Sequence, residues 1–293
     1  MGPVPVRGIR ADAGRLAADA VREAVGVRGL AVHVPVLVDE VAFLLRPRDG
    51  GWVIDGTVGM GGHAEAMLDR TDTDVRVLGL DTDPEALRQA GERLARFGAR
   101  ARLAHASFAD LEAVAAEHGI GEARSVLLDL GVSSWQLEAS GRGFSFQGDE
   151  PLDMRLDPTR GEPARALLNR LPEAELSRIL HEYGEERFAR RIARVIVQRR
   201  PLATTADLVA AVRAAVPRAA WPRRLHVATR TFQAVRMAVN DEPGALRRAL
   251  EAAPRLLARG GRLGVIAFHS GEDRIVKQTF RSLEAAGFAA LEP

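Results

Sequence analysis

The chain has 293 residues, of which 46% are hydrophobic and 27% charged, and its formal net charge is +2. A chain of this length can bury a full core, as one large domain or as two. It contains no cysteine, which excludes disulfides, thiolate zinc sites, cysteine nucleophiles and cysteine-bound iron–sulfur clusters. Because no apolar run reaches about eighteen residues, we expect no membrane span and a cytoplasmic location.

The N-terminal part of the chain precedes any clear α/β pattern. Residues 1–32 are rich in alanine and broken by charges, without the continuous apolar core of a signal peptide. We expect them to form a loosely ordered extension.

Apolar runs then alternate with helix-forming segments through the first half of the chain. The pattern predicts strands at 52–55, 75–80, 100–104 and 125–130. Between the strands it predicts helices near 36–46, 62–70, 84–97 and 109–118. This alternation is typical of an α/β fold with a doubly wound, mostly parallel sheet.

Strand signals disappear from about Pro151. The segments 172–200 and 204–216 are predicted to be helical, the latter capped by Thr204 or Thr205. A helix within 241–261 and a strand within 262–270 then restore the alternation. We therefore expect an inserted α-helical domain, with boundaries at 33–148 for the first part of the core, 149–225 for the insert and 226–293 for the second part of the core.

The segment VIDGTVGMGGHAEAML, residues 53–68, carries the strongest functional signal. An apolar run ends on Asp55 and turns through four glycines into a helical segment, and the next apolar run ends on Asp81, twenty residues after Gly61. Glycines that let the backbone approach a ligand, followed by an acid that can accept both hydroxyls of a ribose, are typical of a βαβ nucleotide site. The alternative is a plain strand-to-helix connection.

The spacing of the glycines indicates which nucleotide binds. From Gly59 the sequence runs G-M-G-G-H, which is not the G-x-G-x-x-G pattern that brings backbone N–H groups to a pyrophosphate. S-adenosylmethionine has no phosphate but carries a sulfonium and an ammonium group, so an acid such as Asp55 near the turn suits it better. We expect S-adenosylmethionine rather than a dinucleotide.

Polar residues also follow two later strands. Asp129 and Ser133 come just after a buried strand, while His269 and Asp273 follow the last strand. Open α/β sheets bind their ligands at this edge, although Asp129 and His269 are also residue types that cap helices. Phe108, after the third strand, is placed to lie against an adenine ring, but a lone phenylalanine is more often part of a core.

Arginine is concentrated in one region of the chain. Between Arg187 and Arg236 there are twelve arginines against one acid, Asp207, which predicts contact with nucleic-acid phosphates. The alternative is a solvated helix face, because Lys277 is the only lysine in the chain and arginine replaces it elsewhere.

Eight segments together resemble the bacterial small-subunit rRNA methyltransferase H family. They are HVPVL (33–37), DGTVGMGGH (55–63), LDLGVSSWQL (128–137), RGFSF (142–146), PLDMR (151–155), YGEERFARRIAR (183–194), ATRTFQAVRMAVNDE (228–242) and FHSGEDRIVK (268–277). The resemblance implies a class I, Rossmann-like methyltransferase that uses S-adenosylmethionine to methylate N4 of a cytidine in the decoding region of 16S rRNA. It also implies the small ribosomal subunit as partner, with no metal and no membrane.

Matching the family motifs position by position implies which residues hold the cofactor. The glycine-loop contacts are Gly61, Gly62 and His63, Asp81 binds the ribose, Phe108 lies beside the adenine, and Asp129 and Gln136 make further contacts. The family's arginine-rich C-terminal tail has no counterpart after Pro293, which predicts a truncated chain with reduced RNA affinity.

The chemistry of cytosine suggests how the methyl group is transferred. The lone pair of N4 is delocalised into the ring, so an acceptor must draw on its N–H bonds during a direct displacement. Candidates for this catalytic role are a backbone carbonyl in DLGVSS and the side chains of Asp129, Ser133, His269 and Asp273. The target base must leave any stack, and Trp135 or Phe144 is expected to receive it.

Other functions share parts of this pattern. A DNA or other RNA amino-methyltransferase would have the same cofactor site, and a non-catalytic RNA-binding assembly factor would keep the arginines without turnover. A nicotinamide dehydrogenase would need the dinucleotide spacing. The oligomeric state stays open, with a dimer as one alternative.

Overall fold

The structure is a computed structural model that describes residues 5–8, 35–47, 50–71 and 74–290. The chain divides into two compact units. The first combines Met1–Gly131 with Pro243–Pro293, and the second is Val132–Glu242. The expected insert, 149–225, lies within the second unit, which extends further in both directions. The second unit extends beyond residue 225 because helix α11 (Thr229–Val239) belongs to it: the buried Phe232 and Val235 of this helix join its core.

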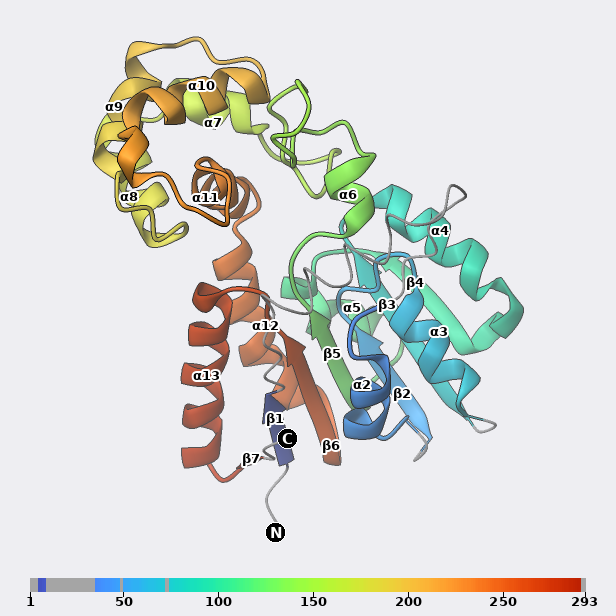
Figure 1. Cartoon of the computed structure of the whole chain (residues 1–293). Coiled ribbons are helices and arrows are strands. Elements are labelled where there is room, and N and C mark those ends of the chain that lie inside the picture. Colours follow the sequence, from blue (N-terminus) through green and yellow to red (C-terminus); the bar gives the residue numbers. More distant parts are fainter. Residues whose placement is uncertain (1–4, 9–34, 48–49, 72–73, 291–293) are drawn as a thin grey trace. The chain divides into compact units, whose positions relative to one another are not determined.

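The first unit is built on a seven-stranded sheet in the order β4-β3-β2-β5-β6-β1-β7 (Figure 1). The strands are β1 (Pro5–Gly8), β2 (Gly51–Asp55), β3 (Val75–Asp81), β4 (Ala101–His105), β5 (Ala123–Asp129), β6 (Leu257–Ile266) and β7 (Ala289–Ala290). Every pairing in the sheet is parallel. The predicted parallel α/β fold is thus confirmed, and all five predicted strands are present. Four of them end within two residues of the expected bounds, whereas β6 begins at Leu257, inside the segment predicted as helix, and ends at Ile266.

The N-terminal extension contributes one element to this sheet. Residues 5–8, which we expected to be loosely ordered, form β1 between β6 and β7. The rest of the extension, 1–4 and 9–32, lies outside the described residues.

Helices cover both faces of the sheet because alternate strand residues point to opposite sides. Val53, Val77 and Leu127 pack with α2 (Val38–Leu45), α3 (Gly62–Asp69) and α4 (Pro84–Leu94). Their neighbours Ile54 and Leu78 pack on the other face, with α5 (Leu111–Glu117), α12 (Glu242–Leu256) and α13 (Ser270–Ala285). Strands β2, β3 and β5 are therefore buried on both faces, which explains why they appear in the sequence as continuous apolar runs.

The strand order reverses at the centre of this sheet. From β2 the chain moves outward through β3 to β4, then returns to place β5 on the other side of β2. In parallel α/β sheets, ligands bind outside the carboxyl ends of the strands at such a switch point. The fold therefore places the candidate site at the ends of β2 and β5.

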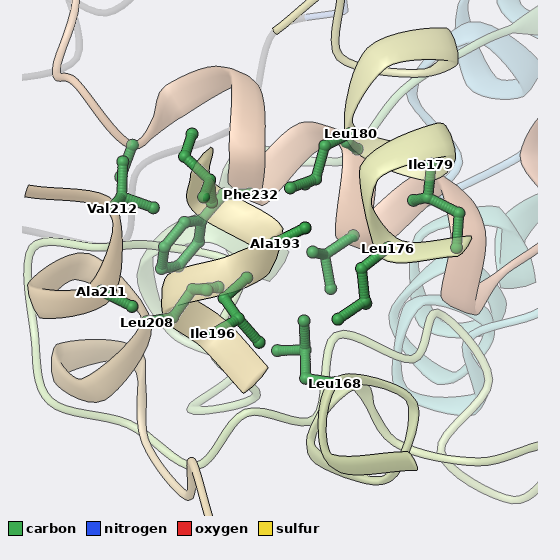
Figure 2. Packing of buried hydrophobic residues seen from close by; sticks show 14 of the residues in the cluster. Leu168, Leu176, Ile179, Leu180, Ala193, Ile196, Leu208, Ala211, Val212 and Phe232 are labelled. Atoms are coloured by element: carbon green, nitrogen blue, oxygen red, sulfur yellow. The ribbon is translucent and has the colours of Figure 1, made fainter. Parts of the chain in front are cut away.

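The second unit is helical and has its own core. Its helices are α6 (Ser134–Glu138), α7 (Ala164–Arg170), α8 (Glu173–Glu182), α9 (Ala189–Gln198), α10 (Thr205–Ala215) and α11. Figure 2 shows side chains from α7 to α11 meeting in this core, including Leu168, Leu176, Ile196, Leu208 and Phe232.

Local sequence signals explain two of these helices. On α9, Ile192 and Ile196 are fully buried while the arginines lie on the outer face, as the helical spacing predicts. Thr204 rather than Thr205 caps α10, in a reciprocal capping box with Asp207.

Among the described residues, no helix combines the length and apolarity that crossing a membrane requires.

Candidate active site

Three aspartates end neighbouring strands at the switch point. Asp55 is the last residue of β2, Asp81 of β3 and Asp129 of β5. Because β2 pairs with both β3 and β5 in parallel register, the three carboxyl groups emerge at one edge of the sheet. In the sheet Asp55 is paired with Gly79 and Leu127, two residues before Asp81 and Asp129, and all three acids lie at strand ends.

The glycine-rich turn between β2 and α3 is tied to these strand ends. The Gly56 N–H donates to the Leu127 carbonyl oxygen and the Val58 N–H to the Leu80 carbonyl oxygen, both at 2.9 Å. Gly59 N–H donates to Asp81 Oδ2 at 2.9 Å. The turn is therefore held across β5 and β3 rather than projecting freely from the sheet.

Gly61 and Gly62, the glycines predicted to touch the cofactor, also have local structural reasons to be glycine. Gly61 has a φ of 84° and precedes α3 without a side-chain cap. A Cβ on Gly62 would lie 2.5 Å from Cγ of Pro35. The N–H groups at the uncapped start of α3 lack intrahelical partners, which makes this turn suited to a carboxylate.

Behind the turn lies a polar cluster in which Asp55 and His63 are buried and Asp129 is partly exposed. Asp55 is fully buried and accepts the Thr57 N–H on Oδ1 at 3.2 Å. His63, on the first turn of α3, is 6% exposed and places Nε2 3.5 Å from Asp129 Oδ2. The backbone N–H of Asp129 donates to Thr57 Oγ1 at 2.6 Å, which fixes the end of β5 against the turn.

Three buried polar atoms of this cluster have no hydrogen-bond partner within the described chain. They are Asp55 Oδ2, His63 Nε2 and Asp129 Oδ1. An unsatisfied buried polar group costs about 1–3 kcal/mol, so a native protein rarely leaves three together without a ligand to complete them. The cluster is therefore the strongest structural indication of a polar ligand.

The electrostatics of the acids favour a positively charged ligand. Burial raises the pKa of Asp55 from 3.8 to about 7, opposed mainly by His63 and the Thr57 N–H. Burial also raises the pKa of Asp81 from 3.8 to about 6, opposed by the N–H groups of Asp83 and Gly59. A cation placed against these carboxyls would favour their ionised forms.

Phe108 lies at the same edge of the sheet. It begins the short helix η4 (Phe108–Asp110), directly after β4, and is partly buried. A Cβ on Gly56 would lie 3.0 Å from the Phe108 Cβ, so this residue borders the glycine turn. The position is compatible with the expected adenine contact, although the side chain also packs against the core on that face.

Ser133 and Gln136, the candidate site residues that follow β5, belong to the second unit and cap a helix there. Ser133 Oγ accepts the Gln136 N–H at 3.2 Å, and Gln136 Oε1 accepts the Ser133 N–H at 3.0 Å. Ser133 and Gln136 thus form a capping box at the start of α6. The S-x-x-Q spacing of these two residues is the sequence signal for this local role.

Of the two aromatic residues expected to receive the base, Phe144 does not fit. Phe144 is 6% exposed and belongs to the core of the second unit. A ring enclosed by its own core cannot accept a nucleobase, so that expectation is wrong. Trp135 is partly exposed, with the Arg142 guanidinium 5.5 Å from the ring centroid.

The residues expected after β6 are engaged in the first turn of α13. His269 caps this helix, with Nδ1 accepting the Glu272 N–H at 3.3 Å and Nε2 lying 3.2 Å from Glu272 Oε1. Asp273 forms an ion pair with Lys277 one turn later. Both side chains therefore stabilise the helix that follows β6.

Two candidate site residues were not assigned from the sequence. Asp55 was noted only as an acid near the turn, although it ends a strand just as Asp81 does. Phe268 is a large apolar residue, 38% exposed, whose ring lies against Gly131 at the end of β5. A bulky residue between a strand and a helix cap was the available signal for Phe268, but its exposure depends on the tertiary structure.

A doubly wound parallel sheet with acids at its switch point, a glycine turn and no pyrophosphate pattern defines a Rossmann-like enzyme of the class I methyltransferase type. The model of the MraW methylase family matches residues 30–290. The ribosomal RNA small subunit methyltransferase H of Geotalea uraniireducens is 53% identical over 253 residues, covering 85% of this chain and 81% of the relative. The chain therefore belongs to the MraW methylase family.

Further relatives agree with this assignment. The proteins of the same name from Geotalea daltonii and Symbiobacterium thermophilum are 54% and 53% identical, covering 86% and 85% of this chain and 81% and 79% of the relatives. The solved structure of an rRNA methylase from Streptococcus thermophilus is 23% identical over 37% of this chain and 58% of that chain, with a TM-score of 0.26. The family assignment rests on the sequence matches.

The cofactor of this methylase is S-adenosylmethionine, and the switch-point residues fit it. The unpartnered oxygens of Asp55 and Asp129 can accept hydrogen bonds from an ammonium group. The uncapped start of α3 suits a carboxylate, and Asp81 is placed for a ribose. Among the described residues, no group of acids and histidines has a metal-binding arrangement.

Proposed function

We propose that the protein methylates N4 of a cytidine in the decoding region of 16S rRNA, within the small ribosomal subunit. The relatives named ribosomal RNA small subunit methyltransferase H support the class of substrate. The observation that supports a role as an enzyme is the cluster of Asp55, His63 and Asp129, which has three buried polar atoms without a hydrogen-bond partner in the described chain.

Each part of the switch point has a distinct task in this proposal. S-adenosylmethionine, when bound, supplies a methyl group activated by its sulfonium. Asp81 holds the ribose with the lone pairs that its bonds to Gly59 and Asp83 leave available. Phe108 supports the adenine, while Asp55 and His63 hold the charged amino-acid part and leave Asp129 for the target amine.

Asp129 is the best candidate for the acceptor that activates the amine of cytosine. The amine becomes nucleophilic only when an acceptor draws on its N–H bonds, because its lone pair is delocalised into the ring. Asp129 Oδ1 has no hydrogen-bond partner within the described chain, and Asp273 pairs with Lys277. His269 uses Nδ1 to cap α13, and its Nε2, which also has no hydrogen-bond partner within the described chain, lies 3.2 Å from Glu272 Oε1. Ser133 is a weaker candidate, since its hydroxyl already accepts the N–H of Gln136.

Direct displacement requires no covalent intermediate on the protein. Asp129 would align the amine and take up or relay its proton as the new N–C bond forms, and water would remove that proton afterwards. The main contribution of the site is to hold the reacting groups in line and exclude water from them. Phe268, exposed beside the end of β5, offers an apolar surface at this edge for the target base.

The test is transfer of label from S-adenosylmethionine to small ribosomal subunits that lack this modification, followed by nucleoside analysis. We expect N4-methylcytidine, with loss of labelling in Asp81→Ala through weaker cofactor binding. Asp129→Asn, which keeps the size of the side chain but weakens the acceptor, should lower kcat by about 10²–10⁴-fold.

The alternatives give different results in the same assay. Label on another nucleotide or on DNA would identify a different amino-methyltransferase. Cofactor binding without any label would favour a non-catalytic assembly factor. Near-normal turnover by Asp129→Asn would remove this residue from the acceptor role.

A further inference from the structure

We propose that the region around Trp221 in the second unit is a binding surface for single-stranded RNA, on which bases stack against aromatic rings while arginines contact phosphates. The inference deepens the proposed function, on which it rests, by assigning the RNA contact to particular residues. We call this region the Trp221 surface and define it by Phe146, Arg213, Arg218, Trp221, Arg223, Arg224, Leu225 and His226.

The first argument is an imbalance of charge. Residues 208–240 contain six arginines and no acid. Four of these arginines, at 213, 218, 223 and 224, are exposed, and no ion pair joins them to an acid within the described chain. Other arginines of the second unit are neutralised locally, for example Arg178 by Glu182 at 2.8 Å and Arg170 by Glu162 at 3.0 Å. The Trp221 surface therefore presents positive charge that its own unit does not balance.

The second argument is the way Trp221 is held. Its indole N–H donates to the Val216 carbonyl oxygen at 3.1 Å, so the polar atom of the ring is already satisfied. The guanidinium carbons of Arg213 and Arg218 lie 5.9 and 5.4 Å from the ring centroid. A fixed aromatic ring with guanidinium groups beside it combines the two kinds of flat surface on which unpaired bases stack.

The third argument is continuity with further rings. Arg213 also lies 3.2 Å from Nε2 of His226, and the His226 ring stacks on Phe146 with centroids 4.5 Å apart and planes 16° from parallel. Arg213 thus links Trp221 to a second aromatic pair. Leu225, next to His226 in the chain, is 56% exposed, which is unusual for a leucine in a strongly basic segment.

These features favour a single strand over other partners. Phosphates account for the unpaired arginines, while the partly exposed rings of Trp221 and His226 and the exposed Leu225 offer contact to base faces. Trp221 and Phe146 also pack against the core of the second unit, which holds these rings in place. An RNA duplex keeps its bases stacked on one another and would use the arginines alone. An acidic protein segment would likewise pair with the charges without needing the aromatic rings.

Helix α9 provides a matched control. Arg190 and Arg191 are also exposed, but the outer face of α9 carries no aromatic residue. If total positive charge alone determined binding, removing these two charges would have the same effect as removing Arg223 and Arg224. The Trp221 surface predicts that the two pairs differ.

The experiment measures binding of a fluorescein-labelled single-stranded RNA of mixed sequence to the full chain, over a range of salt concentrations. We expect Trp221→Leu to weaken binding by about 5–150-fold, since stacking of one base contributes about 1–3 kcal/mol. Trp221→Phe should restore much of the loss. R223Q/R224Q should reduce the slope of log K against log salt by about 1.4, whereas R190Q/R191Q should leave it near the wild-type value.

Several outcomes would overturn the proposal. Equal losses from the two arginine pairs would mean binding by charge alone. Equal affinity for a duplex of the same length, with no dependence on Trp221, would exclude base stacking. An acidic protein partner would be favoured if Trp221→Leu kept the RNA affinity of the wild type and polyglutamate displaced the RNA equally well from both proteins.

Methyl transfer to small subunits separates this proposal from the proposed function. RNA binding that depends on Trp221 without any transfer would refute the function and leave the surface. Transfer with an unchanged KM in Trp221→Leu would refute the surface and leave the function. Affinity for S-adenosylmethionine, measured in each variant, reports whether the first unit is intact.

Discussion

Asp55→Asn isolates the contribution of the buried carboxyl at the end of β2 to stability. Asparagine has nearly the same size and keeps Oδ1 as an acceptor for the Thr57 N–H. Burial raises the pKa of Asp55 in the native state to about 7, whereas the ordinary pKa of an aspartate carboxyl is 3.8. The folded protein therefore binds a proton that the unfolded chain releases between these two pKa values.

The sign of the effect follows from this difference. The stability that Asp55 contributes is fully present below the unfolded pKa of 3.8 and is lost as the pH rises through the folded value of about 7. Because the folded and unfolded pKa values differ in this way, the free energy of unfolding should fall by about 2.5 kcal/mol between about pH 5 and about pH 8. Asp55→Asn cannot ionise and should lack this loss.

Urea unfolding of the cofactor-free proteins across this pH range tests the reasoning. Carboxyls that do not interact with Asp55 titrate equally in both proteins, so the wild-type stability minus that of Asp55→Asn should fall by about 2.5 kcal/mol from about pH 5 to about pH 8. The charges of His63, Asp81 and Asp129, which interact with Asp55, adjust the size of this fall. Glu117→Gln, at an exposed carboxyl on α5, should stay parallel to the wild type. A difference between the wild type and Asp55→Asn that does not change with pH would refute the raised pKa and the account of the cluster built on it.

Two further substitutions test the packing of each unit. Gly62→Ala would place a Cβ 2.5 Å from Cγ of Pro35 and should destabilise the first unit by about 1–3 kcal/mol, measured by urea unfolding. The same substitution should weaken the binding of S-adenosylmethionine, measured in a binding titration. Ile196→Ala removes a fully buried side chain from the core in Figure 2 and should cost about 2–5 kcal/mol in thermal unfolding. Arg194→Ala, on the exposed face of the same helix, should change stability by less than about 1 kcal/mol, and a large loss there would contradict the assigned orientation of α9.

The sheet could be predicted from the sequence because its signals are local and periodic. Strands buried on both faces leave continuous apolar runs, and the short turns between them fix the order of the elements. The acids at positions 55, 81 and 129 could be grouped for the same reason, since parallel neighbours deliver their carboxyl ends to one edge.

The extent of the second unit could not be predicted in this way. Helix α11 follows the expected insert, but a Cβ on Gly184 would lie 2.5 Å from the Arg230 carbonyl oxygen. Such close contact between distant segments draws α11 into the helical unit, and amphipathic spacing alone does not say which core a helix joins.

The sequence left two roles open for polar residues near the site, and helix capping was named beforehand only for Asp129 and His269. Ser133, Gln136 and His269 are chemically suited to catalysis or binding, yet each also satisfies backbone groups at a helix start. Phe144 and Phe268 are the same residue type within family motifs, and only tertiary packing buries the first and exposes the second.

The adjacency of β5 and β6 has a consequence for biosynthesis. The N–H of Leu130, just past β5, bonds to the carbonyl of Ile266 in β6, although the whole second unit lies between them in the chain. During translation the helical unit is therefore complete before β6 leaves the ribosome, and until then β5 is an open edge with unpaired backbone groups. A nascent chain thus acquires its helical, arginine-rich unit before it can complete the sheet that carries the acids of the switch point.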